Sequence, residues 1–344
     1  MLQIVSTFVL AALGVVLFHL ANLPLPWLLG PIFSCLVAAL IGVPLRGIKP
    51  LNDTMRTILG VAVGATLTPT VLSTFPSMLP SFLMVPPMIL LIGAIGVPYF
   101  TRVCGYDFPT AYYSAMPGGL QDVLVFGEEA GGNVRTLSLV HATRVLIIVS
   151  ALPFLLKGIW NADPTNPPGL PASTIPVSEL LIMVVCAIAG WRIAKWMGMF
   201  GASILGPLIL TALVAIGGGL QNRPPAEAVW AAQFFIGMVI GSKYAGITIK
   251  ELRHDVVAAL GFCFILIILT IAFVEIVDGR GLAPGMEALL AFAPGGQAEL
   301  TVLALIVGAD VAFVIAHHIL RIFVVILGAP FAALIFAPPS RKSL

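Results

Sequence analysis

A Pro-Gly-Gly triplet occurs twice in this chain, each time inside strongly apolar sequence. The copies span residues 117–119 and 294–296, and an acid stands three positions after each, as Asp122 and Glu299. Proline and adjacent glycines interrupt a helix, and exposed backbone groups and charges are unfavourable in an apolar environment. Any fold of this chain must therefore accommodate two helix breaks and two acids where both are unfavourable.

The triplets belong to an internal duplication. At the spacing that separates them, His141 recurs as His318 and Arg144 recurs as Arg321. Each histidine precedes its arginine by three residues, so the two side chains share one helix face. Two further sequences recur at nearly the same spacing: Leu-Gly-Pro at 29–31 and 205–207, and G-x-x-x-G at 60–64 and 237–241. Small residues four apart let membrane helices approach closely, so the G-x-x-x-G sequences predict packing positions.

Composition places both halves in a membrane. The chain of 344 residues is 59% hydrophobic and 9% charged, whereas a soluble domain carries about 25% charged residues. The net charge of +2 is close to zero, so its total says nothing about partners. The four cysteines stand singly in or beside apolar runs, which is typical of buried small side chains.

The motif content argues against an enzyme and against a nucleic-acid binder. The sequence has no H-x-x-x-H pair, no carboxylate cluster with metal-ligand spacing and no nucleophile elbow. It also has no basic stripe interleaved with aromatic residues. We therefore predict that the protein is not an enzyme, needs no cofactor or metal, and binds no nucleic acid.

Apolar runs long enough for membrane helices recur along both halves. The first half has runs at 2–20, 27–44, 55–73, 81–101, 109–130 and 134–156. The second half has runs at 178–198, 203–219, 229–247, 256–277, 286–308 and 311–336. The first run lacks the basic region and cleavage site of a signal peptide, so we expect it to remain as a span. We predict an all-α membrane protein with a first membrane repeat at 1–156, a Pro-rich linker at 157–177 and a second membrane repeat at 178–344.

The distribution of Lys and Arg predicts how the halves are oriented, because cytoplasmic loops collect these residues. Suppose that each Pro-Gly-Gly element returns to the side it entered from, and that the N-terminus is cytoplasmic. Then Arg144 and Arg321 lie in the membrane, and the external Lys and Arg are Lys157, Arg223 and Arg280. The bias weakens if every element crosses or if the Gly-Pro elements are re-entrant instead. We predict two inverted repeats, with about ten transmembrane helices, two re-entrant or broken helical hairpins and both termini cytoplasmic.

In an inverted arrangement the two breaks would meet near the membrane midplane. The helix after each break would begin with free N–H groups and a positive dipole end, which favour anions. Glycine lets a ligand approach that backbone closely. We predict that the substrate contacts Gly118, Gly119, Gly295 and Gly296. A tight turn without a ligand is the alternative interpretation of each triplet, and the duplication disfavours it.

The charged residues around the breaks admit two roles. An arginine in the middle of an apolar span is a functional candidate. Arg144 and Arg321 would bind the substrate anion, or would clamp the tips in ion pairs with Asp122 and Glu299. An ion pair that opens on binding would serve both roles. Candidates for coupling or gating are Asp122, Glu299, His141 and His318. The sequence suggests no partner for His254.

These motifs together resemble the AbrB family of bacterial integral membrane proteins. The run PGGLQDVLVFGEEAGGNVRTLSLVHATRVLIIVSALPFL, its second copy and the LPLPWLLGP sequence carry the resemblance, which extends over nearly the whole chain. It implies a multi-pass protein of the bacterial inner membrane. Members of the family carry labels as ammonia monooxygenases or as regulators of gene expression. The metal cluster that a copper monooxygenase needs is absent from this sequence. In architecture, broken elements in inverted repeats also resemble elevator-type transporters.

We therefore expect a secondary active transporter of a small organic anion, coupled to H⁺ or Na⁺, with its site at the two Pro-Gly-Gly tips. The alternative is a non-transporting membrane regulator or sensor of gene expression that binds the same kind of ligand. The duplication favours transport, because alternating access needs two opposed gates. The lipid bilayer is the other expected partner, and the glycine-rich helices permit a homodimer.

Overall fold

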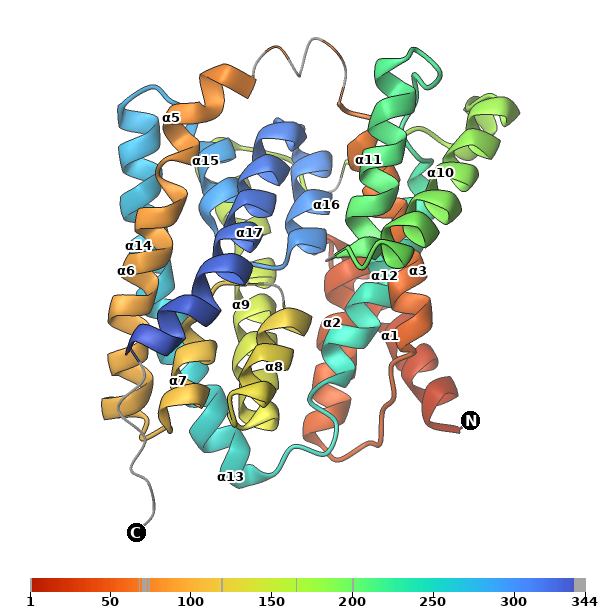
Figure 1. Ribbon diagram of the computed structural model, residues 1–344. Coiled ribbons are helices and arrows are strands. Elements are labelled where there is room, and N and C mark those ends of the chain that lie inside the picture. Colours follow the sequence, from red (N-terminus) through yellow and green to blue (C-terminus); the bar gives the residue numbers. More distant parts are fainter. Residues whose placement is uncertain are drawn as a thin grey trace. The chain divides into compact units, whose positions relative to one another are not determined.

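The computed structural model describes residues 2–67, 69, 73, 75–118, 120–164, 166–199 and 201–336. Within these ranges the chain is helical and contains no strand (Figure 1). Five helical segments are long and apolar enough to cross a membrane: Gln3–Leu20, Phe75–Val103, Val134–Trp160, Val177–Trp196 and Ile249–Gly279. The prediction of an all-α protein with membrane-like helices is confirmed. The number of crossings and the inverted orientation of the halves stay predictions.

The chain forms two compact units, and each draws on both halves of the sequence. Unit 1 consists of Met1–Ser77, Ser150–Ile247 and Ala298–Ile315. Unit 2 consists of Met78–Val149, Thr248–Gln297 and Ala316–Leu344. The predicted boundary at 157–177 therefore separates two stretches of sequence that contribute to both units. In that stretch, α9 continues to Trp160 and a short 3-10 helix covers Ala172–Thr174.

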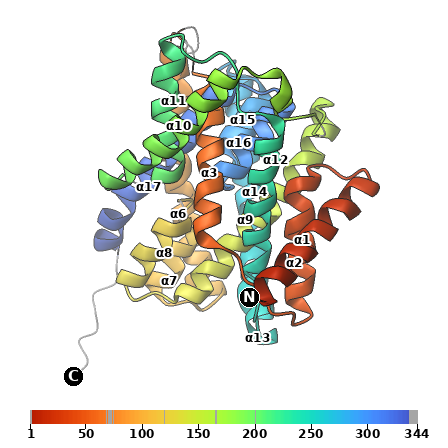
Figure 2. The same cartoon turned by 90° about the vertical axis from the view of Figure 1, so that its right-hand side faces the viewer.

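Unit 1 is built from two sets of three helices that pack in the same way. The sets are α1 (Leu2–Leu20), α2 (Pro26–Leu40) and α3 (Lys49–Gly64), and α10 (Val177–Trp196), α11 (Ala202–Ile216) and α12 (Ala226–Ser242). Within each set the first helix packs against the second. Between the sets, α3 packs against α11, and α12 packs against α2. Figure 2 shows α3 between α11 and α12. The two halves of the sequence are thus interlocked in this unit.

Glycines allow these helices to touch through their backbones. A Cβ atom on Gly60 would lie 2.3 Å from the carbonyl oxygen of Ile204, and one on Gly237 would lie 2.5 Å from that of Leu28. Such distances leave no room for any side chain. The predicted packing role of the two G-x-x-x-G sequences is confirmed, and in each case the partner helix comes from the other half. Within each half, the glycine of the Leu-Gly-Pro sequence, Gly30 or Gly206, meets a glycine that the sequence analysis did not single out, Gly14 or Gly190.

Unit 2 contains the helices on either side of the first Pro-Gly-Gly triplet. Its helices are α5 (Leu79–Phe82), α6 (Val85–Pro98), α7 (Phe108–Ala115), α8 (Leu120–Glu129), α13 (Ile249–Glu251), α14 (Val257–Gly279) and α15 (Gly285–Phe292). It also contains the first part of α9 (Val134–Trp160) and the later part of α17 (Val311–Phe336). Phe100, Phe262 and Phe292 are fully buried in its core. Short π-helical turns adjoin α6 and α14, at Tyr99–Val103 and Leu252–Val256.

Both predicted helix breaks are confirmed. The first separates α7 from α8, and the second separates α15 from α16 (Gln297–Val307), most of which is counted in unit 1. At the first break the chain turns back on itself. The backbone N–H of Asn133 donates to Thr110 Oγ1 at 2.8 Å, and a Cβ atom on Gly127 would lie 3.5 Å from that of Tyr113. Helices α7 and α8 therefore form a hairpin whose ends are joined.

Candidate functional site

The two helices that lead into the breaks end for a local reason. Met116 and Ala293 each precede the proline of a triplet, and both have extended backbone angles, with ψ of 126° and 125°. A residue before proline avoids helical angles because the proline ring collides with its backbone. Helices α7 and α15 therefore stop one residue earlier, at Ala115 and Phe292, and their last carbonyl groups are left without helical partners.

At the first break, two side chains of α9 donate hydrogen bonds to backbone carbonyl groups. Arg144 donates from Nη1 to the carbonyl oxygen of Met116 at 3.1 Å and from Nη2 to that of Gly118 at 3.4 Å. One turn earlier, His141 Nε2 donates to the carbonyl oxygen of Tyr113 at 3.0 Å. The histidine therefore holds a carbonyl group in the last turn of α7, and the arginine holds two carbonyl groups just after its end.

The second break repeats this arrangement with residues of α17. Arg321 donates from Nη1 to the carbonyl oxygen of Ala293 at 2.7 Å and from Nη2 to that of Gly295 at 3.2 Å. His318 Nε2 donates to the carbonyl oxygen of Leu290 at 2.9 Å. His318 Nδ1 lies 3.3 Å from Arg321 Nη2 and accepts from it, so this ring is neutral.

A cation suits this position for two reasons. The C-terminal end of a helix carries a partial negative charge, which attracts a guanidinium group. The planar fork of arginine also matches two carbonyl oxygens at once. The described acceptors are backbone carbonyl groups, whereas the sequence had suggested carboxylates as ion-pair partners. Arg144 and Arg321 thus hold backbone carbonyl groups at the two breaks.

The arginines keep both their charge and an unused donor. Arg144 and Arg321 are 3% and 5% exposed, and the Nε–H group of each is buried without a hydrogen-bond partner. The carboxylates of Glu251 and Asp255 meet other partners, Arg135 and His254 respectively. Neither Arg144 nor Arg321 is therefore neutralised by a described carboxylate.

The first tip and the second arginine are neighbours within unit 2. A Cβ atom on Gly118 would lie 2.8 Å from Cγ1 of Val325, which stands one helical turn after Arg321 on α17. The charges of Arg144 and Arg321 are also close enough to act on each other. The carbonyl group that Arg144 holds therefore lies beside the helix that carries Arg321, and two buried positive charges share one region.

The other predicted site residues are placed as follows. Gly118 and Gly295 are buried and Gly296 is partly buried, whereas Gly119 and the side chain of Asp122 lie outside the described residues. Glu299 is 5% exposed and belongs to unit 1, where its charge acts on Lys243. Arg321 belongs to unit 2, so the predicted pairing of Glu299 with Arg321 stays a prediction.

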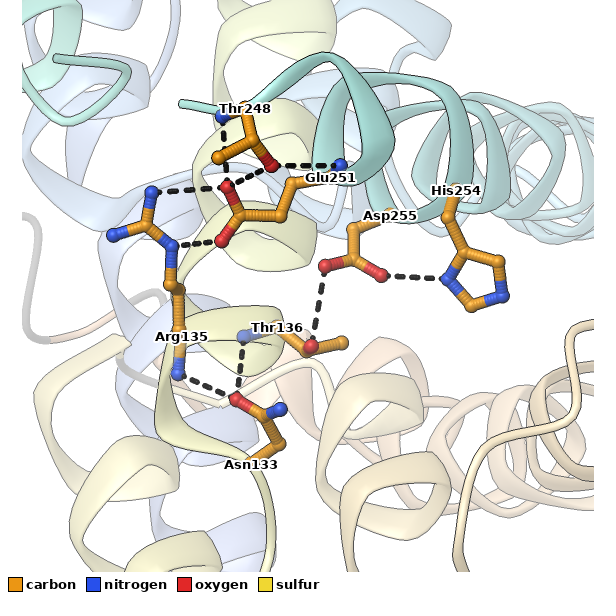
Figure 3. Close-up of polar contacts among 7 residues, drawn as sticks. All are labelled: Asn133, Arg135, Thr136, Thr248, Glu251, His254 and Asp255. Carbon is orange, nitrogen blue, oxygen red and sulfur yellow. Dashed lines mark hydrogen bonds and ion pairs between the residues drawn. The ribbon is translucent and has the colours of Figure 1, made fainter. Parts of the chain in front are cut away.

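Sequence reasoning missed a polar cluster in unit 2 that is centred on Asp255 (Figure 3). This carboxylate is 6% exposed and accepts three hydrogen bonds. The donors are the Tyr106 hydroxyl at 2.9 Å, the Thr136 hydroxyl at 3.1 Å and His254 Nδ1 at 2.8 Å. Burial raises the pKa of the Tyr106 hydroxyl above its usual value, and the Asp255 carboxylate raises it further. Tyr106 therefore stays protonated and remains a donor.

An ion pair stands beside this cluster. Arg135 donates from Nε to Glu251 Oε1 and from Nη2 to Oε2 at 3.1 Å (Figure 3). Glu251 also caps the start of α13, where Thr248 completes a capping box with it. Together with Asp255, these contacts join α13 and the π-helical turn after it to the start of α9 and to the loop before α7. We call this set of contacts the base latch.

The base latch escaped detection because its members are far apart in the sequence. Tyr106 and Thr136 lie 149 and 119 residues from Asp255. The only local signal was the adjacency of His254 and Asp255, and we had assigned His254 no partner. In the structure His254 has two hydrogen-bond partners. Its Nδ1 donates to Asp255, and its Nε2 donates to the carbonyl oxygen of Cys104 at 3.1 Å.

Comparison with known proteins agrees with the resemblance noted in the sequence. The family model described as "Transition state regulatory protein AbrB" matches residues 27–337. An uncharacterized protein of Bacillus subtilis (strain 168), YhjN, is 27% identical over 294 residues, which are 79% of this chain and 75% of that protein. An AbrB protein of Escherichia coli (strain K12), named as a proposed regulator, is 24% identical over 322 residues, with 91% and 90% covered. Because the family match extends over both breaks and both arginine-bearing helices, this chain belongs to the AbrB family.

Proposed function

We propose that the protein is a secondary active transporter of a small organic anion. The observation that carries the proposal is the pair of buried arginines, Arg144 and Arg321, which hold no described counter-ion and keep an unused Nε–H donor each. A buried charge is strongly unfavourable unless it is paired. An anion that enters the membrane region between α9 and α17 would supply the missing charge and the missing acceptors.

The backbone at the second break supports the same proposal. In the described part of the chain, no backbone–backbone hydrogen bond outside the helices uses the N–H group of Gly295 or Gly296. Arg321 holds the carbonyl oxygen of Gly295, which fixes the orientation of the peptide that follows. The start of α16 also places a positive dipole end at this break. The glycines would therefore offer N–H donors to an anion, as predicted for Gly118, Gly119, Gly295 and Gly296.

We propose the following membrane arrangement. The two halves are inverted repeats with about ten transmembrane helices and two re-entrant hairpins in the inner membrane, and both termini are cytoplasmic. The closed hairpin of α7 and α8 supports a re-entrant first element. Single cysteines at positions 135 and 310 test the orientation, since the first should react with a membrane-impermeant reagent from the cytoplasm and the second from outside. Labelling of both from one side would contradict inversion.

Coupling to H⁺ or Na⁺ is part of the proposal. Asp122, Glu299, His141 and His318 remain the candidates, and Glu299 has the clearest support because it is buried within reach of the charge of Lys243. Replacing Glu299 with Gln should abolish the response of uptake to an imposed ion gradient while anion binding persists. If uptake by this variant still responded to the ion gradient, Glu299 would not be the coupling residue.

The competing function is a membrane regulator or sensor that binds an anion without moving it. The name of the E. coli relative, a proposed regulator, favours it. The two functions differ in one measurement. A transporter accumulates the anion inside sealed vesicles against a gradient, and a sensor only binds it. The repeated clamp geometry at the two breaks supports transport, because a sensor needs only one.

The decisive experiment is uptake of radiolabelled organic acids by proteoliposomes under imposed H⁺ and Na⁺ gradients. We expect accumulation of one class of acid by the unaltered chain. Arg144→Gln and Arg321→Gln should each reduce uptake by at least about 100-fold, since a buried charged contact is lost. Arg102→Gln is the matched control, because Arg102 is exposed and should leave uptake unchanged. Full uptake by both site variants would refute the location of the site.

A further inference from the structure

We propose that the site at the two arginines takes a dianion, a small molecule with two negatively charged groups. This inference rests on the proposed function for the place of the site and goes beyond it in fixing the charge of the ligand. It follows from the charges and the unused donors of Arg144 and Arg321.

The first step is the charge balance. The hydrogen bonds of Arg144 and Arg321 to described residues go to neutral acceptors, namely backbone carbonyl oxygens and, for Arg321, the neutral ring of His318. Arginine keeps its proton in proteins. Among the described side chains, both ion pairs lie elsewhere, at the base latch. Two positive charges with no counter-ion among the described side chains therefore lie in one buried region.

The second step is that these charges are coupled. Gly118, whose carbonyl oxygen Arg144 holds, packs against α17 one turn after Arg321. The two buried guanidinium groups therefore lie in one region of unit 2. A monoanion would neutralise one of them and leave the other unpaired, whereas a dianion removes both the repulsion and the desolvation penalty. The site therefore favours two negative charges over one.

The third step is the count of free donors. Each arginine has one buried Nε–H group without a partner. Two donors on two different helices match a ligand with an oxyanion group at each end. A dicarboxylate has this form, and a compact inorganic dianion such as sulfate shares its charge. The shared chemistry is a doubly charged oxyanion, and the two sources are separated by experiment.

Binding to the purified full chain in detergent at neutral pH and constant ionic strength tests the inference. The probes are malonate, succinate and glutarate, each compared with its own monoamide, and sulfate as the inorganic dianion. At least one dicarboxylate should bind about tenfold or more tightly than its monoamide, because the monoamide keeps the size but loses one charged contact. Sulfate that binds more tightly than every dicarboxylate would assign the site to an inorganic dianion.

Variants show whether the preference comes from the two arginines. In Arg321→Gln the ratio of dicarboxylate to monoamide affinity should fall to about one, since one charge remains. Arg321→Lys keeps the charge and should keep the preference, which a purely structural role would not predict. Equal binding of dicarboxylates and monoamides by the unaltered chain would overturn the dianion while leaving an anion transporter in place. Failure of every probe to bind or to be taken up would overturn both.

Discussion

At both Pro-Gly-Gly breaks, an arginine donates to the carbonyl group before the proline and to a glycine carbonyl, while a histidine one turn earlier holds the helix that leads in. The surroundings of the two breaks differ. Around the first, the base latch and the contact between Asn133 and Thr110 tie the hairpin down. At the corresponding positions of the second stand Asp310 and Glu287, and Met78 corresponds to Asp255. The duplicated residues thus shape the tips, and among the contacts described here unique residues anchor the first base.

This contrast indicates that the duplicated residues and the unique residues have different roles. Residues that recur in both halves form the part of the site that an anion would contact. Residues that occur once add contacts at the base of the first hairpin. The following four predictions test whether the arginine clamps at the two tips are equivalent, and whether the two bases are held differently.

The largest effect is expected at the base latch. Asp255→Ala leaves the buried hydroxyl groups of Tyr106 and Thr136 without their acceptor, and should lower the free energy of unfolding by about 3 kcal/mol. Hydrogen exchange should accelerate in residues 108–129 and stay unchanged in 285–307. Asp278→Ala is the matched control, since Asp278 is exposed on the same helix. Equal acceleration at both breaks would contradict a latch that serves only the first.

The second prediction concerns the equality of the tips. Arg144→Lys and Arg321→Lys should each lower the free energy of unfolding by about 2 kcal/mol, because an ammonium group cannot hold two carbonyl oxygens as a planar fork does. Thermal unfolding of the two variants, measured side by side in one detergent, checks this. A large loss for one arginine with none for the other would show that the clamps differ despite their shared geometry.

The third prediction concerns the packing of the first tip. A Cβ atom on Gly118 would lie 2.7 Å from Val123 Cγ2 and 2.8 Å from Val325 Cγ1. Gly118→Ala should therefore cost about 1.5 kcal/mol of stability by overpacking. Adding Val325→Ala makes room and should recover part of this loss, so the two changes should be non-additive in thermal unfolding. Strict additivity would mean that the tip does not pack against α17 in solution.

The smallest effect is expected at the ion pair of the base latch. Arg135 is 53% exposed, and solvent screens its attraction to Glu251. Arg135→Gln should change the free energy of unfolding by less than about 1 kcal/mol, and added salt should reduce even this difference. Unfolding midpoints at low and high ionic strength measure it. If Arg135→Gln lowered the free energy of unfolding as much as Asp255→Ala does, independently of salt, Arg135 would be the main anchor of the base latch instead of Asp255.

Local chemistry explains what the sequence could reveal. Pro117 and Pro294 stop the helices before them wherever those helices pack, so both breaks were predictable, as were the apolar runs and the duplicated pairs of His and Arg. The expected helix at 55–73 was less accurate, since α3 runs from Lys49 to Gly64. Its predicted end falls where residues 68, 70–72 and 74 lie outside the described ranges.

The sequence by itself thus determined the membrane-like helical class, the duplication, the positions of the breaks and the residues that surround them. Only the tertiary structure decided which atoms those residues meet. It gave Arg144 and Arg321 carbonyl oxygens 26 to 28 residues away as acceptors, and it joined Asp255 to Tyr106 across 149 residues. Helix breaks arise from the backbone of a few neighbouring residues, whereas hydrogen-bond partners depend on how distant helices pack, and that information is spread over the whole chain.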